Sequence, residues 1–323
     1  MHKNRKLFGL VAAVAGVGLM LSACSEGDPG QKKPVSGAEG GEITQIGISV
    51  QDLSNPFFQS MVNGVETSAE ELGAKVNVQD GRQDLAAQSD QIDAFIQQGV
   101  EVILLNAVDS DGIGPAVTRA RDAGIVVVAV DVTAKGAQAT VTLDNVQAGE
   151  LACEHLIEQI GGEGEILIVD GRPISSIQDR VEGCENVLAE HPKVKVVGQQ
   201  NGDNGRALAL TLATDMLTAN PNVRGIFGVN DPTALGANLA AEQAGFTDLV
   251  IVGVDASPEG VSELEKTQSM FEATPKQDPN TQGAIALEMA VKLFNGEELE
   301  SDLVLVETEL ITRENLSTYE GWK

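Results

Sequence analysis

The sequence is poor in cysteine and histidine, with three of each among 323 residues. Beyond Cys24 only Cys153 and Cys184 remain, and no CxxC pair occurs, so a thiolate zinc site is disfavoured. His155 and His191 lie in polar contexts near predicted helix ends, where we expect both to be solvated. Nucleophilic catalysis by a serine–histidine or cysteine–histidine pair therefore has little support. Because GxSxG, GxxxxGK[ST] and strand-to-helix GxGxxG motifs are also lacking, we expect no cofactor and no metal.

Positive charge is scarce as well. The 21 Lys and Arg residues stand against 48 Asp and Glu, which gives a net charge of −27. The first 23 residues contain three bases and no acid, so the chain from Cys24 onward carries −30. Such a surface repels phosphate backbones and anionic lipid headgroups, so we expect no nucleic-acid partner and no basic attachment to a membrane surface. Cations and neutral solutes remain compatible with it.

A long apolar run occurs only near the N-terminus. After the basic residues 1–6, residues 7–21 are apolar and rich in Gly and Ala, and the run is short for a membrane-spanning helix. This arrangement predicts a signal peptide over residues 1–23. Residues 24–42 are rich in Gly, Ser and Pro without an apolar period, and we expect them to form a flexible tether.

The predicted cleavage site has a further feature. Leu21-Ser22-Ala23-Cys24 resembles the bacterial lipobox, in which the cysteine becomes the lipid-modified first residue. This resemblance implies a mature protein that begins at Cys24 and is held outside the cytoplasm, in the periplasmic space or at the outer face of the cytoplasmic membrane, with the lipid as its sole membrane contact. The alternative is an ordinary signal peptide followed by an unmodified cysteine.

Beyond the tether, apolar strands alternate with helical patterns, and wholly apolar strands between helices are typical of parallel sheets covered on both faces. The sequence therefore predicts an α/β fold with two doubly wound, Rossmann-like parallel-sheet lobes. The strands are expected at 43–50, 75–79, 102–105, 125–130, 165–169, 193–198, 224–229 and 249–254. The helices are expected at 56–72, 84–98, 112–123, 146–160, 176–191, 204–219 and 231–244.

Polar side chains follow most of these strands. In open parallel sheets, solutes bind beyond the carboxyl ends of the strands, where these residues lie. Asn and Asp are also ordinary turn and N-cap residues, so turn chemistry alone is the alternative interpretation. The candidates are Gln51, Asn55, Asn106, Asp131, Asp170, Arg172, Asn230 and Asp255.

Aromatic residues are few, at 3% of the chain, yet Phe57 and Phe58 are adjacent at the start of a predicted helix. Neighbours on a helix point about 100° apart, so a core role for both is awkward. We expect one ring to pack inward and the other to face a cleft between the lobes.

The ordered motifs resemble the ribose-type periplasmic binding proteins, which are the solute-binding components of carbohydrate ABC importers. The resemblance covers about residues 43–322 and implies the type I fold of that class, with two lobes joined by three hinge strands. The same fold forms the effector domain of LacI-type repressors, but an export signal stands here instead of a helix-turn-helix. The motifs are Asn55-Pro56-Phe57-Phe58, 106–111 (NAVDSD), Val130-Asp131, Asp144-Asn145, 180–183 (RVEG), 228–236 (GVNDPTALG) and 252–255 (VGVD).

The resemblance also implies lobe boundaries. The N-terminal lobe would comprise 43–144 plus 277–308, and the C-terminal lobe 145–276 plus 309–323. The chain would cross between the lobes near Asp144-Asn145, Lys276-Gln277 and Thr308-Glu309.

The site that the resemblance implies suits a sugar, which offers hydroxyls over apolar C–H faces. The carboxylates of Asp131 and Asp255 would accept from hydroxyls, Arg180 would donate and offset both acids, and a phenylalanine would lie against the C–H face. Amides would both donate and accept. The implied ligand-binding set is Gln51, Asn55, Phe57, Phe58, Asn106, Asp131, Arg180, Asn204, Asn230, Asp255 and Gln277.

Three residues of this set have an alternative interpretation. Asp255 could cap a helix that follows Ala256, and Gln277 could be a plain hinge residue. Arg180 could pair with Glu182 or Glu185 on the surface.

Two positions depart from the ribose-binding pattern. Val132 stands where those proteins carry an arginine, and Asn204 stands where they carry a second aromatic ring. The pocket would keep its hydroxyl-binding acids and lose one cation and one ring. We therefore favour a sugar alcohol, another pentose or a cyclitol over ribopyranose, with Arg172 or Arg82 as a replacement cation.

The pairing of Cys153 and Cys184 stays open at this point. They lie on the predicted helices 146–160 and 176–191, which could be neighbours. In an oxidising compartment they can form one disulfide, and the alternative is two buried free thiols.

Taken together, these features predict a monomeric, non-enzymatic, lipid-anchored receptor that delivers a small neutral carbohydrate or polyol to ABC permease subunits. A sensor that presents its ligand to a chemoreceptor or histidine kinase is an alternative. A secreted glycoside hydrolase that uses Asp131 and Asp255 is a weaker one, because it needs one acid held protonated, and Arg180 would keep both ionised.

Overall fold

The computed structural model describes residues 41–322. The predicted signal peptide, Cys24 and all but the end of the predicted tether lie outside the described residues. None of the helices within 41–322 is long and apolar enough to cross a membrane.

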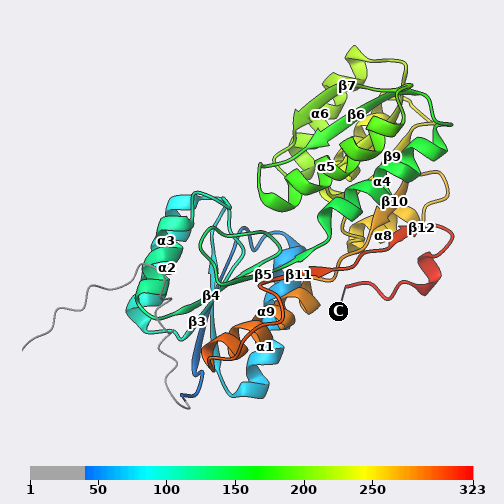
Figure 1. Cartoon of the computed structure of the whole chain (residues 1–323). Coiled ribbons are helices and arrows are strands. Elements are labelled where there is room, and N and C mark those ends of the chain that lie inside the picture. The colour runs from blue at the N-terminus through cyan, green and yellow to red at the C-terminus, as the bar shows by residue number, and fades with distance from the viewer. Residues whose placement is uncertain (1–40, 323) are drawn as a thin grey trace, which may run out of the picture. The chain divides into compact units, whose positions relative to one another are not determined.

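The first sheet is wholly parallel, with the strand order β11–β5–β4–β3–β1–β2. Helices α1 and α9 cover one face, and α2 and α3 cover the other (Figure 1). The central strands are therefore buried on both faces, which explains their continuous apolar sequences. The elements are β1 (Gln45–Val50), α1 (Pro56–Leu72), β2 (Lys75–Asp80), α2 (Leu85–Gln98), β3 (Val102–Leu105), α3 (Gly114–Asp122), β4 (Val126–Val130), β5 (Ala139–Leu143), α9 (Pro279–Phe294) and β11 (Leu303–Val306).

The second sheet has the order β12–β10–β9–β8–β6–β7, and all its pairs are parallel except β10–β12. Helices α4 and α5 pack on one face, and α6, α7 and α8 on the other. The elements are α4 (Asn145–Gln159), β6 (Gly164–Asp170), α5 (Ser175–Glu190), β7 (Val194–Asn201), α6 (Arg206–Ala219), β8 (Val223–Gly228), α7 (Asp231–Ala244), β9 (Val250–Val252), α8 (Pro258–Leu264), β10 (Phe271–Pro275), β12 (Leu310–Thr312) and the short 3-10 helix η1 (Leu316–Thr318).

The predicted α/β fold of two doubly wound parallel sheets is confirmed. Every strand and helix predicted between residues 43 and 254 is present, with ends that differ by at most three residues. The prediction missed β5, α8, β10, α9, β11 and β12. β5 follows β4 without an intervening helix, which breaks the alternation, and the edge strand β11 is only partly buried, so it lacks a buried apolar run.

The chain passes between the sheets three times, after β5, between β10 and α9, and between β11 and β12. The strands of the first sheet come from 45–143 and 303–306, and those of the second from 164–275 and 310–312. The exact lobe boundaries given above stay a prediction.

Helices α4 and α5 approach each other closely. A side chain at Gly149 would collide with the carbonyl of Arg180, and one at Gly183 would collide with the carbonyl of Val146. The structure joins Cys153 of α4 to Cys184 of α5 by a disulfide, with the two Cα atoms 5.2 Å apart. This tight pairing fixes the position of Arg180, which lies one turn before the bonded cysteine.

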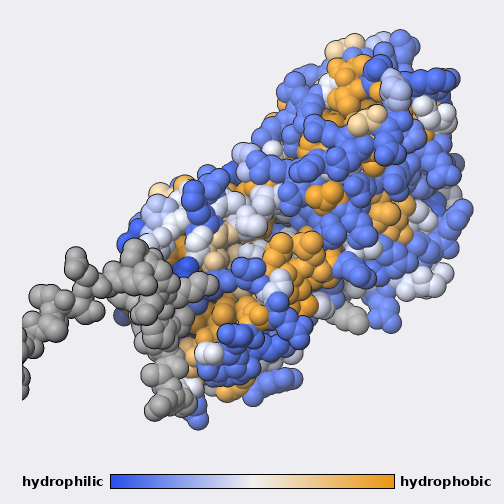
Figure 2. Space-filling view, in the orientation of Figure 1, coloured by the Kyte–Doolittle hydropathy of each residue, from blue (hydrophilic) through white to orange (hydrophobic). Residues whose placement is uncertain are grey.

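Hydrophilic residues cover most of the face shown in Figure 2, in keeping with 48 acids in the chain. Large exposed apolar side chains occur on the edge strand β11, where Leu303 and Leu305 are about half exposed. An apolar area is visible in the region of β11 and α9 in Figure 2.

Candidate ligand-binding site

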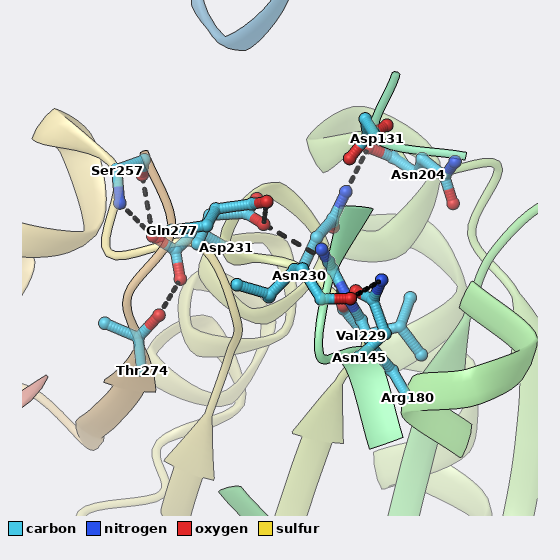
Figure 3. A network of polar contacts seen from close by, with 12 residues as sticks. Asp131, Asn145, Arg180, Asn204, Val229, Asn230, Asp231, Ser257, Thr274 and Gln277 are labelled. Carbon is cyan, nitrogen blue, oxygen red and sulfur yellow. Dashed lines mark hydrogen bonds and ion pairs between the residues drawn. The ribbon is translucent and has the colours of Figure 1, made fainter. Parts of the chain in front are cut away.

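Arg180 organises the polar network at the strand ends of the second sheet (Figure 3). Its side chain is almost fully buried. Nη1 donates to Oδ1 of Asp255 at 3.2 Å and to the carbonyl of Val229 at 2.8 Å, and Nε donates to Oδ1 of Asn145 at 2.9 Å. The alternative interpretation of Arg180 as a surface partner of neighbouring glutamates is therefore wrong.

Asp255 is also held by an amide from the neighbouring crossing segment. Nε2 of Gln277 donates to the same Oδ1 of Asp255 at 2.5 Å, and Oε1 of Gln277 accepts from Gln282 at 3.0 Å. Helix α8 is capped by Ser257, so Asp255 does not serve as its N-cap. One oxygen of the Asp255 carboxylate therefore accepts from both the guanidinium of Arg180 and the amide of Gln277.

A second cluster lies at the strand ends of the first sheet. Asn106 is fully buried, and its Nδ2 donates to Oδ2 of Asp131 at 2.9 Å and to the carbonyl of Val130 at 3.1 Å. Oδ1 of Asn106 accepts from the backbone N–H of Gln51 at 3.2 Å. Nε2 of Gln51 is buried without a hydrogen-bond partner, a costly state for an amide donor in a protein interior.

A short relay of hydrogen bonds connects the two clusters. Asn145, which accepts from Arg180, donates through Nδ2 to Oγ1 of Thr142 at 3.0 Å. Oγ1 of Thr142 donates in turn to the carbonyl of Asp131 at 2.6 Å. The arginine of the second sheet is therefore joined to the backbone of Asp131 by two intermediate side chains.

Burial raises the pKa of the acids in both clusters. It raises the pKa of Asp131 to about 6, although the charge of Arg180 and the hydrogen bond from Asn106 oppose the shift. Burial also raises the pKa of Asp255, against the opposing effects of Arg180 and Gln277. Arg180 favours the ionised form of both acids, as expected, but burial is the larger effect, so the pKa of each acid is raised.

Asn230 and Asn204 lie on the second-sheet side, and Asn230 directly follows Val229 of the Arg180 network. Asn230 caps α7, and its Nδ2 donates to the carbonyl of Asn204 at 3.2 Å. Oδ1 of Asn204 accepts from the backbone N–H of Arg172 at 3.1 Å. Any side chain at Gly171 would collide with that oxygen, so glycine there allows the contact.

The two suggested replacement cations differ in their surroundings. Arg172 pairs with Asp203 at 2.7 Å, and its Nη1 donates at 3.4 Å to the carbonyl of Gln83 in the loop after β2. Arg82 is exposed. A direct role for either in ligand binding stays a prediction.

The aromatic pair is more deeply buried than expected. Asn55 caps α1 by accepting from the N–H of Phe57. Phe57 and Phe58 are both more than nine-tenths buried, with ring centroids 5.2 Å apart, so neither ring is open to solvent. Phe57 differs from its neighbour by packing edge-on against Trp322, at 5.6 Å.

Val132 is an apolar core residue, and His155 differs from its sequence-based description. Val132 is fully buried within the apolar core, so it supplies no cation to the site. His155 lies inside α4 rather than at its end and is half-buried, with Nε2 3.8 Å from Glu272 and without a hydrogen-bond partner. The expectation that it is solvated is wrong. Within residues 41–322, no group of three or more His, Cys, Asp or Glu residues could hold a metal ion.

Sequence reasoning missed several residues of this region, among them Asn145, Thr142, Asp231 and Trp322. Asp231 is fully buried and accepts from Ser257, through both N and Oγ, and from Oγ1 of Thr274, each at 2.7 Å. Burial, with the charge of Asp255, raises the pKa of Asp231 to about 7. The motif Asn230-Asp231-Pro232 signalled a helix start but gave no sign that this carboxylate would be enclosed by Ser257 before α8 and by Thr274 of β10.

Comparison with known proteins gives the context for this geometry. The family model for a periplasmic binding protein domain matches residues 46–298. The ribose import binding protein of Bacillus subtilis is 32% identical over 287 residues, which is 88% of this chain and 92% of that protein. The xylitol-binding protein of Mycolicibacterium smegmatis is 30% identical over 313 residues, 95% and 86% of the two chains.

A solved structure agrees with these sequence matches. The solute-binding protein of an ABC transporter from Bacillus halodurans, with bound myo-inositol, superimposes with a TM-score of 0.80 at 28% identity and covers 87% of this chain and 99% of that one. The fold, the strand-end network and the extent of these matches lead to one conclusion. The chain belongs to the periplasmic binding protein family.

Proposed function

We propose that this protein captures a small neutral sugar or polyol between its two lobes and delivers it to an ABC permease outside the cytoplasm. The observation that carries this proposal is the buried network of Asp255, Arg180 and Gln277, joined by a relay to Asp131. Such a network presents charged acceptors and donors at the strand ends of both sheets, where open parallel sheets bind solutes.

The chemistry of the two clusters suits hydroxyl groups. Each sugar hydroxyl both donates and accepts, so it can bridge an acid such as Asp131 and an amide such as Gln51. The buried, unpartnered Nε2 of Gln51 would gain an acceptor from a ligand hydroxyl. A site built on such bonds rejects analogues strongly, because a missing hydroxyl leaves buried polar groups unpaired.

Two kinds of evidence support the proposed ligand class, namely the departures from the ribose-binding pattern and the ligands for which relatives are named. Without an arginine at Val132 and an aromatic ring at Asn204, the site lacks one cation and one flat face. Two relatives are named for ribose and xylitol, and a solved relative holds bound myo-inositol. These compounds are a pentose, a sugar alcohol and a cyclitol. We therefore favour a sugar alcohol, a cyclitol or a pentose other than ribopyranose.

The proposed mechanism is a shift of population between open and closed arrangements of the lobes. A ligand that contacts Asp131 from the first sheet and Asp255 from the second binds the closed arrangement better, and so favours it. The three crossing segments would act as the hinge. The permease would then recognise the closed lobes.

We further propose that the mature protein is a monomer, anchored by a lipid on Cys24. Metabolic labelling with radioactive palmitate tests this anchor. Incorporation into the unchanged chain and its loss in Cys24→Ser would support it, and equal labelling of both would contradict it.

The ligand is testable by thermal shift. The chain from residue 24 onward, with Cys24→Ser, is screened against pentoses, hexoses, pentitols and inositols. We expect one polyol or pentose to raise the unfolding midpoint by several degrees, because a ligand that binds only the folded state stabilises it. No shift with any compound would contradict the proposed ligand class.

Delivery to a permease needs a separate experiment. Deleting the gene should abolish high-affinity uptake of the compound found in the screen. Unchanged uptake with loss of a response to that compound would favour the sensor alternative instead.

A further inference from the structure

The segment before the C-terminus donates to two consecutive carbonyls beside the proposed site. The hydroxyl of Tyr319 donates to the carbonyl of Ala256 at 2.9 Å. Nε1 of Trp322 donates to the carbonyl of Asp255 at 3.0 Å. We call residues 319–322 the C-terminal strap.

The two carbonyls belong to a bend with unfavourable backbone angles. Asp255 has a φ of 132° and Ala256 a φ of 45°, both in the region that favours glycine. Residues with side chains adopt such angles only where surrounding contacts enforce them. This bend aims the carboxylate of Asp255 at Arg180 and Gln277, so its geometry determines the geometry of the network.

The strap supplies fixed contacts to this bend. Burial, with nearby carboxylates, raises the pKa of Tyr319, so its hydroxyl stays protonated and available as a donor. Other contacts to the bend come from Thr274, whose Oγ1 accepts from the N–H of Ala256, and from the N–H of Gln277. The strap is therefore one of three elements that hold the strained peptide, and it is the one that reaches both of its carbonyls.

The strap also contacts the first lobe. The indole of Trp322 packs edge-on against Phe57 of α1, with ring centroids 5.6 Å apart. One side chain thus touches two residues of the proposed ligand set, Phe57 in α1 beside the first sheet and Asp255 after β9 of the second sheet. A shift of Trp322 would disturb both together.

We propose that Tyr319 and Trp322 are positioning residues that hold the strained Asp255–Ala256 bend, and through it the Asp255 carboxylate, in the geometry that binds ligand. This inference rests on the proposed sugar- or polyol-binding function. It adds a role for the C-terminal strap that neither the strand-end pattern nor the motifs indicate.

The first test needs no ligand. Hydrogen exchange is measured for the amides of Asp255, Ala256 and Ser257 in the unchanged chain, Tyr319→Phe and Trp322→Phe. The matched control is Thr318→Val, which removes the adjacent hydroxyl, whose bond goes to Asn315 within the same turn. We expect exchange at the bend to be several-fold faster in the first two variants and unchanged in the control. Equal exchange in all four proteins would overturn the proposal.

The second test measures binding by calorimetry with xylitol, D-ribose and myo-inositol as probes. Tyr319→Phe and Trp322→Phe should each weaken binding about fivefold, as expected for the loss of one neutral hydrogen bond, with thermal stability close to that of Thr318→Val. Equal affinity in every variant would overturn the positioning role.

The two tests separate failure of the strap from failure of the proposed function. If no sugar or polyol binds the unchanged chain, the proposed function is contradicted, and the exchange measurement still decides whether the strap holds the bend. The single tryptophan of the chain adds an independent signal. Its emission should shift in Tyr319→Phe and not in Thr318→Val, because only Tyr319 shares the bend with Trp322.

Discussion

The two sheets place an acid at corresponding strand ends but surround it differently. Asp255 of the second sheet receives hydrogen bonds from a guanidinium and an amide. Asp131 of the first sheet receives one hydrogen bond from the amide of Asn106, and its interaction with Arg180 is electrostatic, without a direct hydrogen bond. The Asp255 cluster of the second sheet is thus largely arranged before ligand arrives, whereas the Asp131 cluster of the first sheet keeps a poorly compensated buried charge. The same fold therefore yields one preformed half-site and one that responds to ligand and pH.

The largest expected effect comes from removing the cation of the preformed half. Arg180→Met should lower the free energy of unfolding by about 3–5 kcal/mol and abolish ligand binding, because it leaves Asp255 buried without its partner. Arg206→Ala is the control, since its ion pair with Glu259 is about half exposed and should contribute about 0–1 kcal/mol. Urea unfolding of both variants measures the difference. A cost for Arg180→Met no larger than for the control would contradict the asymmetry.

Asp131→Asn should instead raise the free energy of unfolding of the ligand-free protein. Burial raises the pKa of Asp131 from 3.8 to about 6, so its contribution to stability is full below pH 3.8 and is lost as the pH rises through 6. At pH 7.5 the ionised carboxylate is a cost that asparagine removes, and we expect a gain of about 1–3 kcal/mol.

The matched variant in the other half is Asp255→Asn. Burial raises the pKa of Asp255 as well, but asparagine also leaves Arg180 without its counter-ion, so we expect Asp255→Asn to gain less stability than Asp131→Asn at pH 7.5. Both are measured by urea unfolding between pH 4 and pH 7.5. If Asp131→Asn gains no more stability than Asp255→Asn at pH 7.5, the two halves do not differ in the way described.

Ligand affinity should fall as the pH falls through 6. A protonated Asp131 is a poorer acceptor for a ligand hydroxyl, so binding that requires the ionised form weakens up to about tenfold between pH 7 and pH 5. Calorimetric titrations at several pH values measure this slope. Asp131→Asn should bind more weakly and lose the slope, and an unchanged slope in that variant would assign the titration to another group.

The smallest effect is expected at Arg172. Its partner Asp203 is half exposed, and its contact with Gln83 is long, so Arg172→Ala should cost about 0–1 kcal/mol of stability. Affinity should change less than about threefold if Arg172 only joins loops of the two lobes. A loss above tenfold would instead make Arg172 the ligand cation that Val132 does not supply.

The sequence was most informative where a local pattern decides structure. Apart from β5, the apolar strands and capped helices up to residue 254 were predictable because each has its own period and end signals, such as Asn55 before α1 and Gly245 after α7. The later elements β11 and β12 were not, since a partly exposed edge strand and a three-residue strand carry little pattern of their own.

The residues of the site also divide into those that the sequence could predict and those that it could not. The family resemblance indicated Arg180, Asp255 and Gln277, whose contacts lie at expected strand ends. The relay through Asn145 and Thr142 could not be read from spacing, because it depends on how α4 meets α5 across a close helix contact. Trp322 was equally inaccessible, since its partners lie 67 and more residues away in the chain.

The central claim is that a neutral sugar or polyol binds against the Asp255–Arg180 network, and calorimetry tests it most directly. Xylitol, D-ribose and myo-inositol are titrated into the unchanged chain, Asp255→Ala and the surface control Arg206→Ala. We predict saturable binding of at least one compound to the unchanged chain and to Arg206→Ala, and a loss of about 30-fold or more in Asp255→Ala, as expected for truncating a buried charged hydrogen bond. Equal affinity of Asp255→Ala and the unchanged chain would contradict the account.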